Sequence, residues 1–246
     1  MSKASQHRIG AFNTTQAEAL LREGLSEFAS ETRDTINEGQ IKKLIDYLAL
    51  MAKWNPVYNL TAIRQTNEMV SAHLLDSIAI ISHLEQWLAN KSKASILDVG
   101  TGGGLPGVVL AILRPDWSLT LIDPVHKKTA FLQQVKAQLS LNNLTVVTGK
   151  VEDLPSEQRF DLITSRAFAS IALFVHLSHA VLADDGCFAA MKGILPSEEI
   201  SELQQAFTNQ WQIETHEIHV PQLNAQRHLV KISRINATHI HPKGTS

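Results

Sequence analysis

Apolar residues follow two different rhythms along this chain, and the rhythm changes near residue 90. In the first part they recur at steps of three and four positions, which is typical of amphipathic helices. The clearest apolar stripe consists of Ile41, Leu44, Ile45, Leu48 and Met51. The pattern predicts a helical extension over 1–90, a main domain over 91–236 and a flexible tail over 237–246.

Two local signals set the expected ends of these helices. Asn37 is followed three positions later by Gln40, which resembles a capping box at the start of the striped helix. Pro56 is expected to end that helix, because the residue before a proline avoids the helical conformation and Asn55 would leave it. A further helix is expected over about 67–89.

From residue 95 short apolar segments alternate with amphipathic helices, as in a parallel sheet covered on both faces. Strands are expected at 95–100, 118–123, 144–148, 160–165 and 187–192, with helices near 106–114, 126–141, 170–182 and 197–209. Two more candidate strands, 212–220 and 227–234, have so short a link that they should pair antiparallel. The prediction is an α/β fold with a mostly parallel seven-stranded sheet that ends in an antiparallel hairpin.

Composition narrows the functional classes. Hydrophobic residues make up 44% and charged residues 19% of the 246 residues, as in soluble globular proteins. The net charge of −2 gives no overall attraction to nucleic acid, so an RNA partner must be held by a local basic patch. No apolar run is long enough for a membrane span, and the lone Cys187 excludes a cysteine zinc cluster. We expect a cytoplasmic monomer with no membrane contact and no metal, and we expect His176 and His179 at the surface.

The most informative segment is I-L-D-V-G-T-G-G-G-L-P-G at 96–107, a glycine loop between a strand and a helix. Glycines at such a junction let the backbone and the positive end of the helix approach a ligand. Asp123 ends the next strand, where a carboxylate can accept hydrogen bonds from both hydroxyls of a ribose. A tight turn without a ligand is the simplest alternative, but the placement of Asp123 favours an adenosine-type cofactor.

The glycines fit two cofactor templates. Gly102, Gly104 and Gly107 satisfy the dinucleotide pattern G-x-G-x-x-G. Gly100, Gly102 and Gly104 satisfy the D-x-G-x-G-x-G pattern of methyltransferases that use S-adenosylmethionine (SAM). The loop alone does not decide between them.

Three further features favour SAM. Asp98 stands two residues before the first glycine, where its carboxylate can attract the cationic methionine part of the cofactor. Val151 and Glu152 follow the third strand, where a backbone N–H and a side chain can meet an adenine edge. The third feature is the C-terminal hairpin, which is the ending expected of a methyltransferase fold. A dehydrogenase would usually need a substrate domain as well, for which the chain has no room.

The sequence resembles the RsmG (GidB) family of bacterial methyltransferases that act on small-subunit ribosomal RNA. The likeness covers about 53–230, and its most specific motifs are W-N-x-x-x-N-L-T, H-x-x-D-S and S-R-A-F-A-S. The matching segments are K-W-N-P-V-Y-N-L-T-A-I (53–63), H-L-L-D-S-I (73–78), D-V-G-T-G-G-G-L-P-G (98–107), K-K-T-A-F-L (127–132), S-R-A-F-A-S (165–170), M-K-G (191–193) and R-H-L-V (227–230).

The resemblance implies a class I SAM-dependent methyltransferase (Rossmann-like) fold. It implies methyl transfer from SAM to N7 of guanosine 527 in the 530 loop of 16S rRNA. It further implies cofactor contacts at Gly100, Leu105, Val151, Glu152 and Arg166. The near-neutral charge predicts weak binding to bare 16S rRNA and better recognition of the 30S subunit or an assembly intermediate.

The expected wall of the substrate site combines charged, hydroxyl and aromatic side chains. The residues expected there are His73, Asp76, Ser165, Arg166, Phe168, Lys192 and Arg227. Core packing is the favoured alternative for Phe168, and His73 with Asp76 can equally satisfy backbone groups. Lys127 and Lys128 suit either a phosphate contact or solvated positions. No catalytic residue is expected, because guanine N7 carries a lone pair and no proton.

Two other functions remain compatible with the residues alone. The alternative glycine register supports an oxidoreductase that uses NAD. A ribosome-binding factor without catalytic activity could also retain a SAM-type fold as a scaffold.

Overall fold

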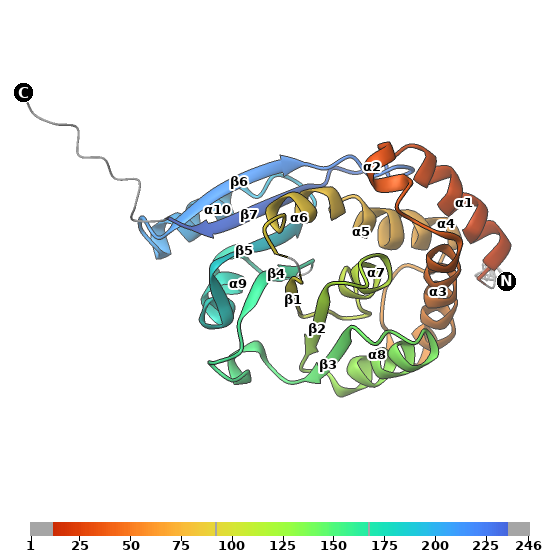
Figure 1. The fold of residues 1–246 in the computed structure, drawn as a ribbon, viewed down its shortest axis with the longest axis horizontal. Coiled ribbons are helices and arrows are strands. Elements are labelled where there is room, and N and C mark those ends of the chain that lie inside the picture. Colours follow the sequence, from red (N-terminus) through yellow and green to blue (C-terminus); the bar gives the residue numbers. More distant parts are fainter. Residues whose placement is uncertain (1–11, 92, 167, 236–246) are drawn as a thin grey trace, which may run out of the picture.

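The computed structural model describes residues 12–91, 93–166 and 168–235. Its centre is a seven-stranded sheet with the order β3-β2-β1-β4-β5-β7-β6 (Figure 1). The strands are β1 (Ser95–Val99), β2 (Ser118–Asp123), β3 (Leu144–Thr148), β4 (Phe160–Ser165), β5 (Leu182–Lys192), β6 (Trp211–Glu217) and β7 (His228–Arg234). Strands β1 to β5 are parallel, and β7 pairs antiparallel with both β5 and β6. The predicted sheet and its C-terminal hairpin are confirmed; the tail predicted over 237–246 lies outside the described residues.

Helices cover both faces of this sheet (Figure 1). They are α1 (Thr14–Ser26), α2 (Ser30–Arg33), α3 (Glu38–Tyr58), α4 (Thr66–Met69), α5 (Asp76–Ile78), α6 (Ile81–Trp87), α7 (Gly107–Leu113), α8 (His126–Gln138), α9 (Ile171–Ser178) and α10 (Ser197–Ala206). Helix α3 packs against α7 and α8, whereas α9 packs against α10 and β5. Successive residues of a strand therefore enter different cores: Ile96 belongs to the core under α3 and α7, and Leu97 to the core under α9. Because both of their faces are buried, the central strands β1, β2 and β4 are mostly apolar.

The strand order reverses next to β1, since the chain runs outward from β1 to β2 and β3 and then returns to β4 on the other side. Ligands of open α/β sheets bind at such a switch point, beyond the carboxyl ends of the strands. The glycine loop that follows β1 therefore lies where a ligand is expected.

The helical extension shares a core with the sheet. The predicted capping box is present, with the Gln40 N–H donating to Asn37 Oδ1 and the Asn37 N–H donating to Gln40 Oε1, both at 3.0 Å. The amide of Gln40 also donates to the carbonyls of Ile112 and Leu113, at 3.1 and 3.2 Å. The cap thus fastens the start of α3 to the end of α7. The domain boundary at residue 90 stays a prediction.

The expected end of α3 was wrong. The helix continues through Asn55 and Pro56 to Tyr58 and ends at Asn59, which has a positive φ of 51°. The preference against helix before a proline is overridden because the Asn55 side chain donates to Thr61 O at 2.9 Å and accepts from Thr61 N at 3.0 Å. These two hydrogen bonds fold the following loop back onto the helix.

The helix expected over 67–89 is also interrupted. A π-helical segment, Val70–Leu75, separates α4 from α5, and α6 begins only at Ile81. Ser71 Oγ donates to Asn67 O, and Ser77 Oγ donates to His73 O, so hydroxyl groups compete for carbonyls along this stretch. Such π-helical turns are frequent at functional sites.

Candidate functional site

The loop after β1 depends on left-handed backbone conformations. Gly100, Gly102 and Gly104 have φ values of 65°, 59° and 101°, which side chains rarely adopt. The Gly100 N–H donates to Ile122 O at 2.9 Å, so the loop begins as a continuation of the β1–β2 pairing. The Tyr47 hydroxyl donates to the carbonyl of Gly103 at 2.7 Å, which ties the loop to α3.

The glycines of this loop face two different environments. At Gly100 and Gly102 the nearest atom lies 3.9 Å from the position of an added Cβ, an ordinary van der Waals distance, so no core side chain crowds these two glycines. At Gly104 and Gly107 an added Cβ would meet core side chains at 2.6 and 2.7 Å. The dinucleotide register requires its second glycine, here Gly104, to face the pyrophosphate. The geometry therefore favours the register that begins at Gly100.

Asp98 lies completely buried beneath the loop. Its Oδ2 accepts hydrogen bonds from the Thr101 hydroxyl at 2.6 Å and from the Gly107 N–H at 3.0 Å. Its Oδ1 is buried and has no partner among the described residues. Burial raises the pKa of Asp98 to about 6, although the two hydrogen bonds act in the opposite direction. A buried carboxylate oxygen without a partner suits a group that brings a hydrogen-bond donor or a positive charge.

Asp123 lies at the tip of β2 and is almost fully buried. Its carboxylate accepts from the N–H groups of Gly102 at 3.0 Å and Val125 at 2.9 Å. Lys128 Nζ lies 3.3 Å from Asp123 Oδ2, so this lysine is an ion-pair partner and not a phosphate contact or a solvated side chain. Oδ2 thus has two donors, whereas Oδ1 has one, so a lone pair of Oδ1 remains for a ribose hydroxyl.

Two further predicted cofactor residues, Val151 and Glu152, lie in the short 3-10 helix Val151–Asp153 that follows β3. Val151 is buried and Glu152 is exposed. The Gly149 N–H donates to Asp123 O at 3.2 Å, and nothing lies within 4 Å of an added Cβ at Gly149. The structure therefore brings these residues to the same sheet edge as the glycine loop, while Leu105, which was predicted to contact the cofactor, is buried in the core.

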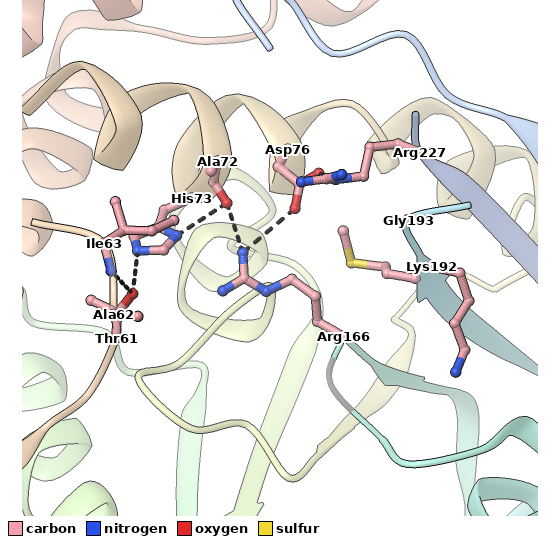
Figure 2. Close-up of a pocket in the computed structure, with 11 residues that line it drawn as sticks. Thr61, Ala62, Ile63, Ala72, His73, Asp76, Arg166, Lys192, Gly193 and Arg227 are labelled. Atoms are coloured by element: carbon pink, nitrogen blue, oxygen red, sulfur yellow. Dashed lines mark hydrogen bonds and ion pairs between the residues drawn. The ribbon is translucent and has the colours of Figure 1, made fainter. Parts of the chain in front are cut away.

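A second cluster of predicted residues lines a cavity of about 430 Å³ (Figure 2). Its lining residues are Thr61, Ala62, Ile63, Ala72, His73, Asp76, Arg166, Met191, Lys192, Gly193 and Arg227. The buried Asp76 carboxylate accepts from Arg227 Nε at 2.8 Å and lies 3.5 Å from Arg166 Nη1. Arg166 Nη1 also donates to the carbonyl of Ala72 at 2.8 Å. Two guanidinium groups against one carboxylate leave a net positive charge at the cavity.

His73 is a structural residue of the cavity wall. Its Nδ1 lies 3.0 Å from the carbonyl of Ala72 and therefore carries the proton, and its Nε2 accepts from the Thr61 hydroxyl at 3.1 Å. Burial and the charge of Arg166 lower the pKa of His73 to about 4, so its ring is neutral near pH 7. In the H-x-x-D-S motif, His73 therefore bonds a backbone carbonyl, as the alternative predicted, whereas Asp76 pairs with two arginine side chains at the cavity.

Other expected wall residues have different roles. Lys192 borders the cavity, but its Nζ points away from it and donates to Glu199 at 2.6 Å (Figure 2). The Ser165 hydroxyl donates to Val99 O at 2.8 Å and joins β4 to β1. Phe168 is partly buried and its ring lies 5.5 Å from the ring of Phe174, as the packing alternative predicted.

The cavity wall also includes Thr61, Ala72 and Met191, which were not predicted from the sequence. Thr61 lies in the quoted segment N-L-T-A-I, so the motif was a usable signal. The carbonyl of Ala72 carries no signal in its side chain, because the π-helical segment directs it toward Arg166.

The described residues contain no group of three or more His, Cys, Asp and Glu side chains arranged to hold a metal ion. His176 is exposed, and its ring lies 6.3 Å from that of His179. Within the same residues, we find no helix with the length and apolar character that crossing a bilayer requires.

The Gly104→Ala variant should be strongly destabilised, because the residue has a φ of 101° and its new Cβ would lie 2.6 Å from core atoms. Backbone strain and overpacking together should lower the free energy of unfolding by about 2 to 4 kcal/mol. Urea unfolding measures this. The control is Gly149→Ala, where the space is open and the backbone ordinary, and an equal loss in both variants would contradict the loop geometry.

Asp98→Asn should change how stability depends on pH. Because the folded-state pKa of Asp98 is raised from 3.8 to about 6, its contribution to stability is present in acid and is lost as the pH rises through 6. Relative to the unmutated protein, the variant should gain about 1 to 2 kcal/mol between roughly pH 5 and pH 7.5. Urea unfolding across this range tests it, with the exposed Asp116→Asn as control; a difference independent of pH would refute the assignment.

Two solved structures that match this fold are methyltransferases. The glycopeptide N-methyltransferase MtfA complexed with S-adenosyl-L-homocysteine matches with a TM-score of 0.54 at 10% identity, over 66% of this chain and 90% of that chain. The ribosomal protein L11 methylase from Lactobacillus delbrueckii subsp. bulgaricus matches with a TM-score of 0.50 at 17% identity, over 65% and 78%. These matches confirm the predicted class I SAM-dependent methyltransferase fold.

Sequence comparisons give the family. A ribosomal RNA small subunit methyltransferase G from Janthinobacterium sp. (strain Marseille) is 48% identical over 229 residues, which cover 91% of this chain and 98% of the relative. The corresponding protein from Chromobacterium violaceum is 48% identical over 214 residues, covering 87% and 96%. A family model, GidB, described as rRNA small subunit methyltransferase G, matches residues 40–230. The chain belongs to the rRNA small subunit methyltransferase G family.

Proposed function

We propose that this protein transfers the methyl group of SAM to N7 of guanosine 527 in the 530 loop of 16S rRNA. Membership of the rRNA small subunit methyltransferase G family supports a SAM-type cofactor and an RNA substrate. The structural observation that carries the proposal is the buried, unpartnered Oδ1 of Asp98 beneath a glycine loop in which no core side chain crowds Gly100 or Gly102. The choice of N7 rests on the resemblance and on the chemistry of the cavity lined by Arg166 and Arg227.

The residues at the carboxyl edge of β1, β2 and β3 fit SAM. Asp98 Oδ1 would receive the ammonium group of the methionine part, and Asp123 would hold the ribose. The backbone N–H of Val151 and the side chain of Glu152 would meet the adenine. When bound, SAM supplies a methyl group on a positively charged sulfur, and the sulfur keeps the bonding electrons when the methyl leaves.

Arg166 stands between the two halves of the proposed site. Its charge acts on the pKa of Asp98 on one side and of His73 on the other, and its guanidinium pairs with Asp76 at the cavity. It would therefore bind the cofactor carboxylate from the edge that also faces the RNA. Asp76 fixes its orientation.

The chemistry of the cavity suits a nucleophile that needs no base. Guanine N7 carries an in-plane lone pair and no proton, so the step requires only that the base be held in line with the methyl group. His73 is neutral with both ring nitrogens engaged, and Asp76 is held by two arginines. The protein's work is therefore positioning, which can contribute about 7 to 11 kcal/mol in well-oriented reactions.

The substrate should be an unpaired or displaced guanosine, because the narrow major groove of an RNA helix hides N7. Arg166 and Arg227 supply a local positive charge on a chain whose net charge is −2. We infer that a monomer acts in the cytoplasm and prefers a folded small subunit or an assembly intermediate. Filter binding should therefore give a lower Kd for 30S particles than for bare 16S rRNA, and equal values would count against this preference.

Mass spectrometry of 16S rRNA tests the reaction directly. RNA from cells that lack this protein should have lost N7-methylguanosine at position 527, and a plasmid copy of the gene should restore it. Persistence of the modification in the deletion strain would refute the proposed function.

Calorimetry tests the cofactor and separates the alternatives. S-adenosylhomocysteine should bind and NADH should not, because the cofactor register begins at Gly100. Asp123→Asn should weaken S-adenosylhomocysteine binding about 10-fold to 100-fold through the lost charged hydrogen bonds, and Asp116→Asn should leave it unchanged. Tight NADH binding would favour the oxidoreductase, and 30S association without cofactor affinity would favour a non-catalytic ribosome-binding factor.

A further inference from the structure

The loop between β5 and α10 presents apolar side chains at the border of the cavity. Ile194 is 75% exposed and Leu195 is 50% exposed, although both are large hydrophobic residues. They follow Lys192 and Gly193 directly, and those two residues line the cavity that holds Arg166 and Arg227. A soluble protein rarely leaves such side chains adjacent to a polar site without a contact surface in its functional complex.

This apolar tip is held in a fixed position. The carbonyl of Gly193 lies 2.8 Å from Nδ1 of His228, which anchors the start of the loop to β7. At the other end, the Ser197 N–H donates to Leu195 O at 3.0 Å. The loop also lies against Lys192, whose Nζ is bonded to Glu199 on α10 at 2.6 Å. Exposure of the two side chains is therefore preorganised, which reduces the entropy lost when a ligand binds to them.

A second hollow of about 410 Å³ lies at this tip and adjoins the first. Both are lined by Lys192 and Gly193, and the second continues along 194–199. Because the hollows share these residues, a nucleotide in the first would bring its neighbour close to the second.

Charge decides which part of a nucleotide enters this hollow. Lys192 is neutralised by Glu199, and Glu198 is exposed on the first turn of α10. The acidic side chains offset the positive end of the helix, so nothing there favours a phosphate. Ile194 and Leu195 instead offer apolar surface to the face of a base.

We propose that Ile194 and Leu195 form an apolar wedge that contacts the unstacked base next to the methylated guanosine. The wedge takes the place of the stacking that the base loses when its neighbour enters the cavity, as apolar side chains do in kinked nucleic acids. This inference rests on the proposed function, because it requires an RNA nucleotide in the cavity.

The test combines Ile194→Ser with Leu195→Ser in the full-length protein. Loss of the base contact should raise the KM for 30S subunits about 10-fold. The melting temperature and the affinity for S-adenosylhomocysteine should not change. Ile235→Ser is the matched control, because Ile235 is 45% exposed but follows the opposite end of β7.

A fluorescence measurement tests the wedge itself. Small subunits assembled with 16S rRNA that carries 2-aminopurine beside the target guanosine should brighten when the unmutated protein binds, and should not brighten with the double variant. An unchanged KM would overturn the wedge. A raised KM with the same fluorescence for both proteins would also overturn it, in favour of contact with a ribosomal protein. If the unmutated protein methylates no small-subunit RNA, the proposed function fails first, and the wedge fails with it.

Discussion

The buried carboxylate of Asp98 is the constraint on which the rest of the site depends. Its Oδ2 bonds to Thr101 near the start of the glycine loop and to Gly107 at its end, so one atom sets the shape of the whole turn. Burial without a partner for Oδ1 is unfavourable for the charged form, as the pKa of about 6 shows. A cationic ligand that reached Oδ1 would remove this penalty. A ligand of that kind would therefore also stabilise the loop.

Asp76 plays a comparable part on the substrate side, and it comes from the helical extension. It joins Arg166, which follows β4, to Arg227, which precedes β7. Tyr47, from the same extension, bonds to Gly103. The extension therefore supplies buried polar groups to both halves of the site. Without the extension, Arg166 and Arg227 would lack their shared carboxylate, so the extension is needed to hold both side chains in place.

The sequence predicted those features that depend on short-range patterns. The central strands were identifiable because burial on both faces makes them mostly apolar, and the capping box at Asn37 is a contact over three residues. The continuation of α3 past Pro56 was not predictable, since it depends on how Asn55 bonds the following loop. The π-helical segment was missed because periodicity does not distinguish it from an α-helix with the same apolar residues.

The site residues show the same difference between short-range patterns, which the sequence reveals, and long-range contacts, which it does not. The motifs located Asp98, Asp123 and Asp76, but the direction of a long side chain depends on partners that the sequence does not reveal. Lys192 turns toward Glu199, seven residues away on the next helix, and Asp76 meets Arg227 across 151 positions. The resemblance placed these residues near one another, whereas the role of each followed only from the contacts.

The contacts also limit which atoms of an RNA this cavity can methylate. A ribose hydroxyl or an exocyclic amine must lose a proton during methylation, and a nearby base has to accept it. Among the lining residues, His73 has a pKa of about 4 with both nitrogens bonded, and Asp76 is paired with two guanidinium groups. His73 is therefore neutral and fully bonded near neutral pH, and the Asp76 carboxylate is already engaged by two guanidinium groups. A ring nitrogen with a free lone pair, which is the kind of acceptor proposed above, needs no such base.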